Sequence, residues 1–178
     1  MMAWRRTAWT SLMALIVLAG VARADISRFV GSFEGAAPVT LADGRTQDRV
    51  MNVKITETKA GFSVAWTTTT LRADGTGSDK SYLVEFVPSD RGDVFAAAMK
   101  RNVFGHGVQL DPMQGEPYVW ARIEGDTLSV YSLFVAEDGG YEIQQFDRTL
   151  ADGGLDLEYQ SVRNGEIGRT VSTFLRRR

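Results

Sequence analysis

The sequence has no cysteine and only one histidine, and each shortage excludes a class of chemistry. Without cysteine there is no disulfide, no thiol nucleophile and no thiolate metal site. One histidine cannot supply the several imidazoles of a histidine-rich zinc site. No Gly-x-Ser-x-Gly elbow and no P-loop is present. We therefore predict no catalytic residue, no metal and no cofactor. The sequence favours a non-enzymatic protein, although paired carboxylates on strands leave glycoside hydrolysis open.

Long apolar runs are also missing, except near the N-terminus. There, Arg5-Arg6 precedes the uncharged, mostly apolar segment Leu12–Ala22, and Ala22-Arg23-Ala24 forms a small-x-small cleavage site. The segment is shorter than the roughly 20 residues that span a bilayer. We predict that residues 1–24 are a cleavable signal peptide and that residues 25–178 form one exported domain. That domain is expected to be periplasmic or secreted, with no transmembrane segment after cleavage.

Strong positive charge is absent from the predicted mature chain. Cleavage removes three arginines, so that 17 of the 20 basic residues face 22 acidic ones. A mildly acidic domain is poorly suited to polyanions, and we predict no nucleic-acid partner. The run Arg176-Arg177-Arg178 is interpreted as a solvated tail after the last strand.

Helical periodicity is missing after residue 24, and alternation of apolar and polar residues takes its place. Glycine-containing turns separate the alternating segments, and Asn164-Gly165 is typical of a two-residue type I′ hairpin turn. Only 94–100 is a short helical candidate, and it fits a strand equally well. The segments with strand patterning are 51–56, 62–67, 118–123, 128–135, 141–146, 155–162 and 167–175.

This pattern predicts an all-β protein, an antiparallel up-and-down meander that closes into a small soluble barrel of about 8–10 strands. The alternative is a two-sheet β-sandwich. Positions expected to face outward carry polar groups, which argues against a membrane barrel; they are Lys54, Arg122, Gln144, Asp156, Glu158 and Thr170. Residues 100–117 carry three glycines and two prolines, and we interpret them as a long irregular lid or rim loop.

The start of the predicted domain carries a short motif, Gly31-Ser32-Phe33, on what should be the first strand. Together with the meander and a basic residue on the last strand, it resembles the lipocalin and calycin barrels. In that family the motif is usually Gly-x-Trp, and an arginine of the closing strand packs over the ring. The resemblance implies that Phe33 supplies the ring and that Arg169 or Arg176 supplies the arginine. It also implies an interior that holds a small apolar ligand.

Five residues are candidates for ligand binding: Trp66, His106, Trp120, Arg122 and Tyr131. The aromatic rings would line a hollow lumen, because core and cavity are the same surface in a barrel. His106 lies between two glycines in the irregular loop. Arg122 alternates in step with Trp120. It would pair with a ligand carboxylate if it pointed inward and would be a surface charge if it pointed outward.

Two functions follow from these observations. The first is an exported, non-enzymatic binding or carrier domain for a small apolar or amphipathic ligand. The alternative is a structural or protein-interaction component of the cell envelope. The segment 128–135 motivates it, because Tyr131, Leu133 and Val135 make its second face apolar as well, which calls for a covering segment or an envelope protein partner.

Overall fold

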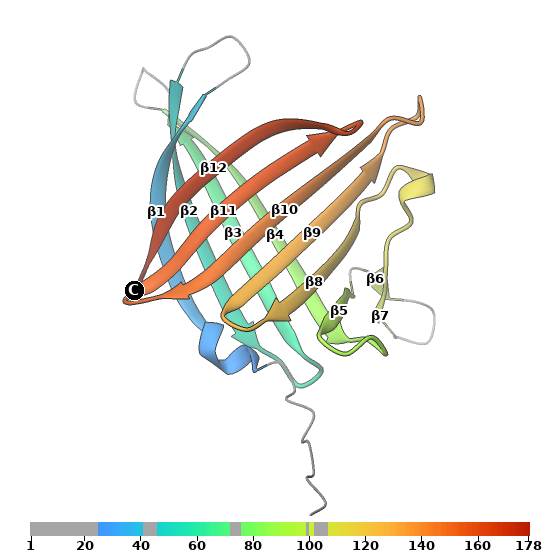
Figure 1. Cartoon of the computed structure of the whole chain (residues 1–178), viewed down its shortest axis with the longest axis horizontal. Coiled ribbons are helices and arrows are strands. Elements are labelled where there is room, and N and C mark those ends of the chain that lie inside the picture. The colour runs from blue at the N-terminus through green and yellow to red at the C-terminus, as the bar shows by residue number, and fades with distance from the viewer. Residues whose placement is uncertain (1–24, 41–45, 72–75, 99, 102–106) are drawn as a thin grey trace, which may run out of the picture.

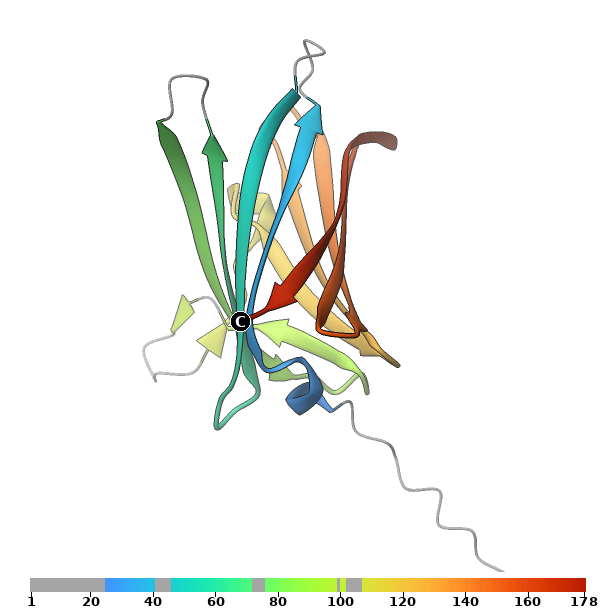
Figure 2. The ribbon, with the colours of Figure 1, turned by 90° about the vertical axis from the view of Figure 1, so that its left-hand side faces the viewer.

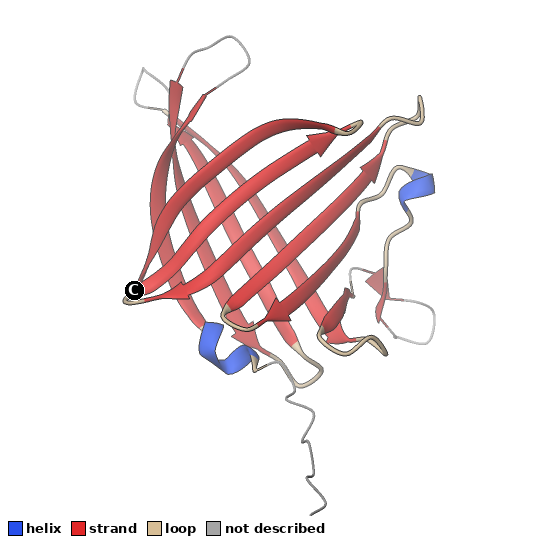
Figure 3. Cartoon of the chain, in the orientation of Figure 1, coloured by secondary structure: helices blue, strands red, loops and turns tan. Residues whose placement is uncertain are grey.

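The computed structural model describes residues 25–40, 46–71, 76–98, 100–101 and 107–178. Strands dominate this part of the chain, as Figures 1 and 3 show, and no helix in it is long and apolar enough to cross a membrane. The elements are η1 (Ile26–Phe29), β1 (Gly31–Thr40), β2 (Thr46–Glu57), β3 (Phe62–Leu71), β4 (Gly77–Pro88), β5 (Val94–Ala97), β6 (Lys100–Arg101), β7 (Gly107–Val108), η2 (Pro112–Gln114), β8 (Tyr118–Glu124), β9 (Thr127–Val135), β10 (Tyr141–Ala151), β11 (Gly154–Arg163) and β12 (Glu166–Arg177).

Ten of these strands form one closed antiparallel barrel in the order β1-β12-β11-β10-β9-β8-β5-β4-β3-β2. Nearly every strand pairs with its neighbour in sequence. The first and last strands close the ring where Phe33 pairs with Arg177. Closure leaves no sheet edge along the seam between the chain ends. The predicted meander barrel is confirmed, and the sandwich alternative is wrong.

The last hairpin shows how local sequence sets the register. Asn164 and Gly165 both have positive φ, 51° and 88°, between the paired residues Arg163 and Glu166. A type I′ turn requires positive φ at both central positions, and its twist matches that of the flanking strands. The predicted turn is therefore confirmed.

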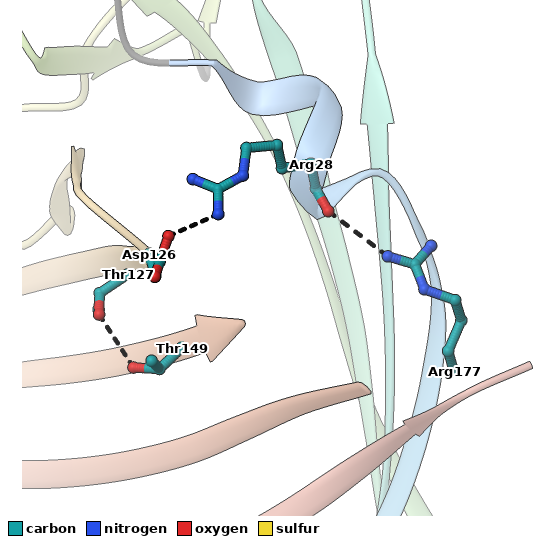
Figure 4. Close-up of polar contacts among 5 residues, drawn as sticks. All are labelled: Arg28, Asp126, Thr127, Thr149 and Arg177. Carbon is teal, nitrogen blue, oxygen red and sulfur yellow. Dashed lines mark hydrogen bonds and ion pairs between the residues drawn. The ribbon is translucent and has the colours of Figure 1, made fainter. Parts of the chain in front are cut away.

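The end of the barrel near η1 is packed solid. Except for Arg148, its interior strand positions are apolar and almost fully buried, because alternate residues of each strand point inward; they include Phe33, Ile55, Phe62, Phe86, Leu128, Leu155 and Leu175, and Phe29 of η1 belongs to the same core. Phe62 stacks on Phe86 and meets Phe95 edge-on, each with ring centroids 5.0 Å apart. Figure 4 shows η1 held across this end by Arg28, which pairs with Asp126 and accepts a bond from Arg177 through its backbone oxygen.

The ring-and-arginine contact expected from the family resemblance is present, but a different arginine makes it. Arg177 lies over the Phe33 ring at 4.7 Å and donates to the Val30 carbonyl at 2.7 Å. Gly31 has a φ of 156°, which disfavours other residues, and a Cβ there would stand 2.4 Å from the Arg177 Nη1 atom and would displace the guanidinium. Neither Arg169 nor Arg176 takes this place. Arg169 lies higher on the same inward face, and the adjacent Arg176 is exposed on the opposite face.

The segment between β4 and β8 is less regular. The ambiguous helical candidate at 94–100 contains strand β5 rather than a helix. In the predicted loop, β6 and β7 pair with each other, and η2 packs against β9. The lid or rim position of the loop stays a prediction, and His106 lies outside the described residues.

Candidate ligand-binding cavity

The half of the barrel away from η1 is hollow. It contains a cavity of about 360 Å³, within the range of small-molecule sites. The cavity is lined by inward-facing residues of seven strands: Val39, Arg49, Met51, Trp66, Thr68, Thr70, Lys80, Tyr82, Gln144, Phe146, Leu157, Tyr159, Arg169 and Val171. Gln144, which the sequence pattern placed outward, therefore faces the interior. It shares the face of Phe146, whereas its neighbour Gln145 takes the outer face.

Four aromatic rings form a layer across the barrel at the base of the cavity. Trp66 stacks on Tyr82 with centroids 5.2 Å apart and meets Phe146 at 5.9 Å. Phe146 meets Tyr159 at 4.7 Å. Trp66 and Tyr82 come from β3 and β4, whereas Phe146 and Tyr159 come from β10 and β11, on the opposite wall in Figure 2. This layer separates the packed end from the hollow end.

Among the described residues, the cavity wall carries three cations, Arg49, Lys80 and Arg169, and no acidic residue. Burial lowers the pKa of Arg49, and the nearby charge of Arg169 lowers that pKa further. An arginine nevertheless stays protonated at neutral pH. The Arg49 Nε atom is buried and has no hydrogen-bond partner among the described residues. In the part of the chain that the structure describes, the cavity wall therefore presents positive charge without an acidic lining partner, beside aromatic and aliphatic surface.

An irregularity in β11 helps to place the cavity arginine of β12. The register between the two strands shifts at Ser161, whose hydroxyl oxygen accepts a bond from the backbone N–H of Arg169 at 2.9 Å. Tyr159 is the next inward residue of β11. Burial raises the pKa of its phenol, although Ser161, Arg169 and Arg49 act to lower that pKa. The phenol therefore stays neutral at pH 7 and can donate a hydrogen bond.

A carboxylate stands near the cavity but is already engaged. Glu142 lies one inward position above Gln144 on β10 and accepts a hydrogen bond from the Gln144 amide at 2.8 Å. It helps to raise the pKa of the Tyr159 phenol. It is not among the described lining residues, so its charge lies beside the cavity rather than on its wall.

The cavity can be reached through the wall beside β4. Strand β4 pairs with β5 over three residue pairs only, from Phe86 to Pro88, so its upper half has no strand partner on that side among the described residues. Tyr82 is in phase with the buried residues Val84 and Phe86 and lines the cavity, yet 54% of its surface is exposed. An inward residue this exposed marks a lateral opening.

Of the five predicted ligand-binding residues, the structure places one in the cavity and three on the outer wall. Trp66 lines the cavity. Trp120 and Tyr131 stack at 4.9 Å on the outer wall, because Val119, Ala121 and Ile123 take the inward positions of β8. Arg122 is also outward and exposed, and it pairs with Glu124 at 2.8 Å. His106 lies outside the described residues. A ligand role for His106, Trp120, Arg122 and Tyr131 stays a prediction.

Sequence reasoning missed the cavity arginines, although strand parity points to them. Arg49 is in phase with Met51, Val53 and Ile55, whose burial makes that face the inner one. Arg169 is in phase with Val171 and the buried Leu175. In both strands, an arginine at the same alternating positions as the apolar residues would have predicted a cation facing the interior.

No group of three or more potential metal ligands comes together in the described part of the chain. No protein-family model matches the sequence, and no curated protein is similar to it. The class of protein is therefore defined by the fold and the cavity alone: a closed ten-stranded antiparallel barrel, hollow and basic at one end.

Proposed function

We propose that this protein is an exported binding or carrier domain whose cavity takes a small amphipathic anion, such as a medium-chain carboxylic acid. The observation that carries the proposal is the juxtaposition of Arg49, Lys80 and Arg169 with an aromatic floor, with no acidic side chain among the lining residues that the structure describes. Charge-assisted hydrogen bonds to guanidinium are strong and suit a carboxylate. The rings of Trp66 and Phe146 would receive the apolar part of the same ligand.

Holding Arg49 and Arg169 close together costs the empty barrel free energy, and this supports the proposal. Burial and the nearby charge of Arg169 lower the pKa of Arg49, so the charged Arg49 guanidinium destabilises the empty barrel. A bound anion would neutralise the two arginines and would satisfy the buried Arg49 Nε atom. Export, predicted from residues 1–24, would place this binding outside the cytoplasm.

The test is a calorimetric titration of the purified protein with decanoic acid and with decanol. We expect the acid to bind more tightly than the alcohol and expect Arg49→Met and Arg169→Met to weaken acid binding about tenfold each. Arg122→Met is the matched control, because Arg122 is an exposed arginine on the outer wall. Equal binding of acid and alcohol, or an equal effect of all three variants, would contradict the proposal.

The second candidate is a protein-interaction component of the envelope. The outward stack of Tyr118, Trp120 and Tyr131 favours it, since Trp120 lies 5.9 Å from one ring and 4.9 Å from the other. Sedimentation of the purified protein separates the two candidates. A stable oligomer that dissociates in Trp120→Ala would favour the interaction function, and a monomer with intact decanoate binding would favour the carrier.

A further inference from the structure

A second arginine site lies on the other side of the aromatic layer. Arg148 of β10 points into the barrel, is 1% exposed and is the largest fully buried side chain in the described part of the chain. Its register partners on the two neighbouring strands are Leu128 and Leu157, both buried. A guanidinium is almost never buried unless it is paired.

No ion pair of Arg148 is found in the part of the chain that the structure describes. Neither Nε nor Nη1 of Arg148 has a hydrogen-bond partner among the described residues. The adjacent Asp147 raises the pKa of Arg148, but its two carboxylate oxygens accept bonds from Ser129 at 2.6 Å and from Gln145 at 2.7 Å. Burial dominates and lowers the pKa of Arg148 to about 10, so the group is still charged at neutral pH.

Arg148 is connected to the cavity through one ring. Its guanidinium carbon lies 5.6 Å from the centre of the Phe146 ring, which belongs to the floor of the cavity. Along β10 the inward positions run Gln144, Phe146, Arg148. Arg148 itself does not line the cavity, so a ligand would reach it from there only when the half-buried ring of Phe146 moves aside.

The backbone positions of the two basic sites are separated along the barrel wall. Arg169 is bonded to Ser161, which pairs with Gln144, so Arg169 lies at the level of Gln144. From Gln144 to Arg148 is four residues, or about 13 Å at the usual rise of a strand. The floor between them is aromatic. A ligand that satisfied both sites would carry an anionic group at each end and an apolar segment in the middle.

We propose that the natural ligand is such a dianion, an apolar chain with a carboxylate at each end, and that Arg148 holds the inner carboxylate. This inference rests on the proposed function and adds the ligand class. The outer carboxylate pairs with Arg49 and Arg169, and the apolar chain passes the rings of Trp66 and Phe146. The uncompensated charge of Arg148 is thereby neutralised only in the loaded protein.

The experiment compares decanoic acid with decanedioic acid, which have the same number of carbons, by calorimetry in chloride-free buffer. We expect the diacid to bind the unmodified protein about tenfold or more tightly than the monoacid, because a charged hydrogen bond is added. Arg148→Met should abolish this preference and leave the affinity for decanoic acid within about twofold. The methionine variant should fold, because removal of a buried, unpaired charge relieves a cost.

The outcomes separate this inference from the proposed function. If both acids bind equally and Arg148→Met changes neither, while Arg49→Met weakens both, then the proposed function holds and the dianion is wrong. If neither acid binds the unmodified protein, the proposed function itself fails. Shorter and longer diacids provide a second check, since the preference should be lost when the chain is too short to join the two sites.

Discussion

Replacing Arg148 by methionine should make the ligand-free protein more stable, although it removes a fully buried side chain. The pKa of Arg148 falls from its ordinary value to about 10 on burial. At about 1.4 kcal/mol for each pKa unit, keeping the charge in the barrel costs on the order of 3 kcal/mol. The substitution loses the cation–π contact with Phe146, worth about 1 kcal/mol. We therefore expect a net gain of about 1–3 kcal/mol, in the range seen for replacing buried charges by apolar residues.

Urea unfolding followed by circular dichroism measures this gain. For a domain of this size each kcal/mol raises the melting temperature by about 2–4 °C, so thermal unfolding provides an independent reading. Arg122→Met is again the control, because an exposed ion pair contributes less than about 1 kcal/mol. A loss of stability of more than about 1 kcal/mol in Arg148→Met, with Arg122→Met unchanged, would show that Arg148 is well partnered and would refute the reasoning.

The difference in unfolding free energy between the unmodified protein and Arg148→Met should depend on pH, and this dependence tests whether the charge of Arg148 is the cause. The pKa of Arg148 is lower in the folded than in the unfolded chain, so above about pH 10 the unfolded chain binds more protons. Stability of the unmodified protein then rises with pH relative to the variant. The advantage of Arg148→Met should be full below about pH 9 and should shrink above pH 10. A constant difference across this range would mean that the charge is not the cause.

Three further predictions test other parts of the structure. Gly31→Ala puts a Cβ at a φ of 156° and 2.4 Å from the Arg177 Nη1 atom and should cost about 1–3 kcal/mol of unfolding free energy in urea, whereas an unchanged stability would contradict this expectation. Asn164→Ala puts a residue without a favourable side chain at a φ of 51° and should cost about 1–2 kcal/mol, again by urea unfolding. Decanoic acid should change the tryptophan fluorescence of Trp120→Phe but not of Trp66→Phe, since only Trp66 lines the cavity; the reverse result would place the ligand on the outer wall.

Local patterns predicted most of the strands and their closure, although β4 was not among the predicted segments. Alternation in segments such as Met51 to Ile55, glycine at the turns and the sequential spacing of the strands all point to the same meander. The contact between Phe33 and a closing-strand arginine was also foreseeable from the resemblance. The particular arginine was not, because Arg176 and Arg177 are adjacent and a shift of one residue reverses the face.

The location of the site could not be derived in the same way. Trp120 and Arg122 were candidates for the interior because they are aromatic and basic, but Val119 and Ala121 fill the inward positions of that strand. In β10 two glutamines stand side by side, so composition alone does not reveal which one faces inward. Whether a barrel end is filled or hollow depends on how side chains of seven strands meet in space, and no single strand carries that information.

The most direct test of the central claim is a crystal structure of the protein soaked with decanoic acid. We expect the acid inside the barrel above the ring of Trp66, with its carboxylate within hydrogen-bond distance of Arg49 or Arg169. A ligand bound only on the outer wall at Trp120 and Tyr131, with the cavity holding only water, would contradict the claim.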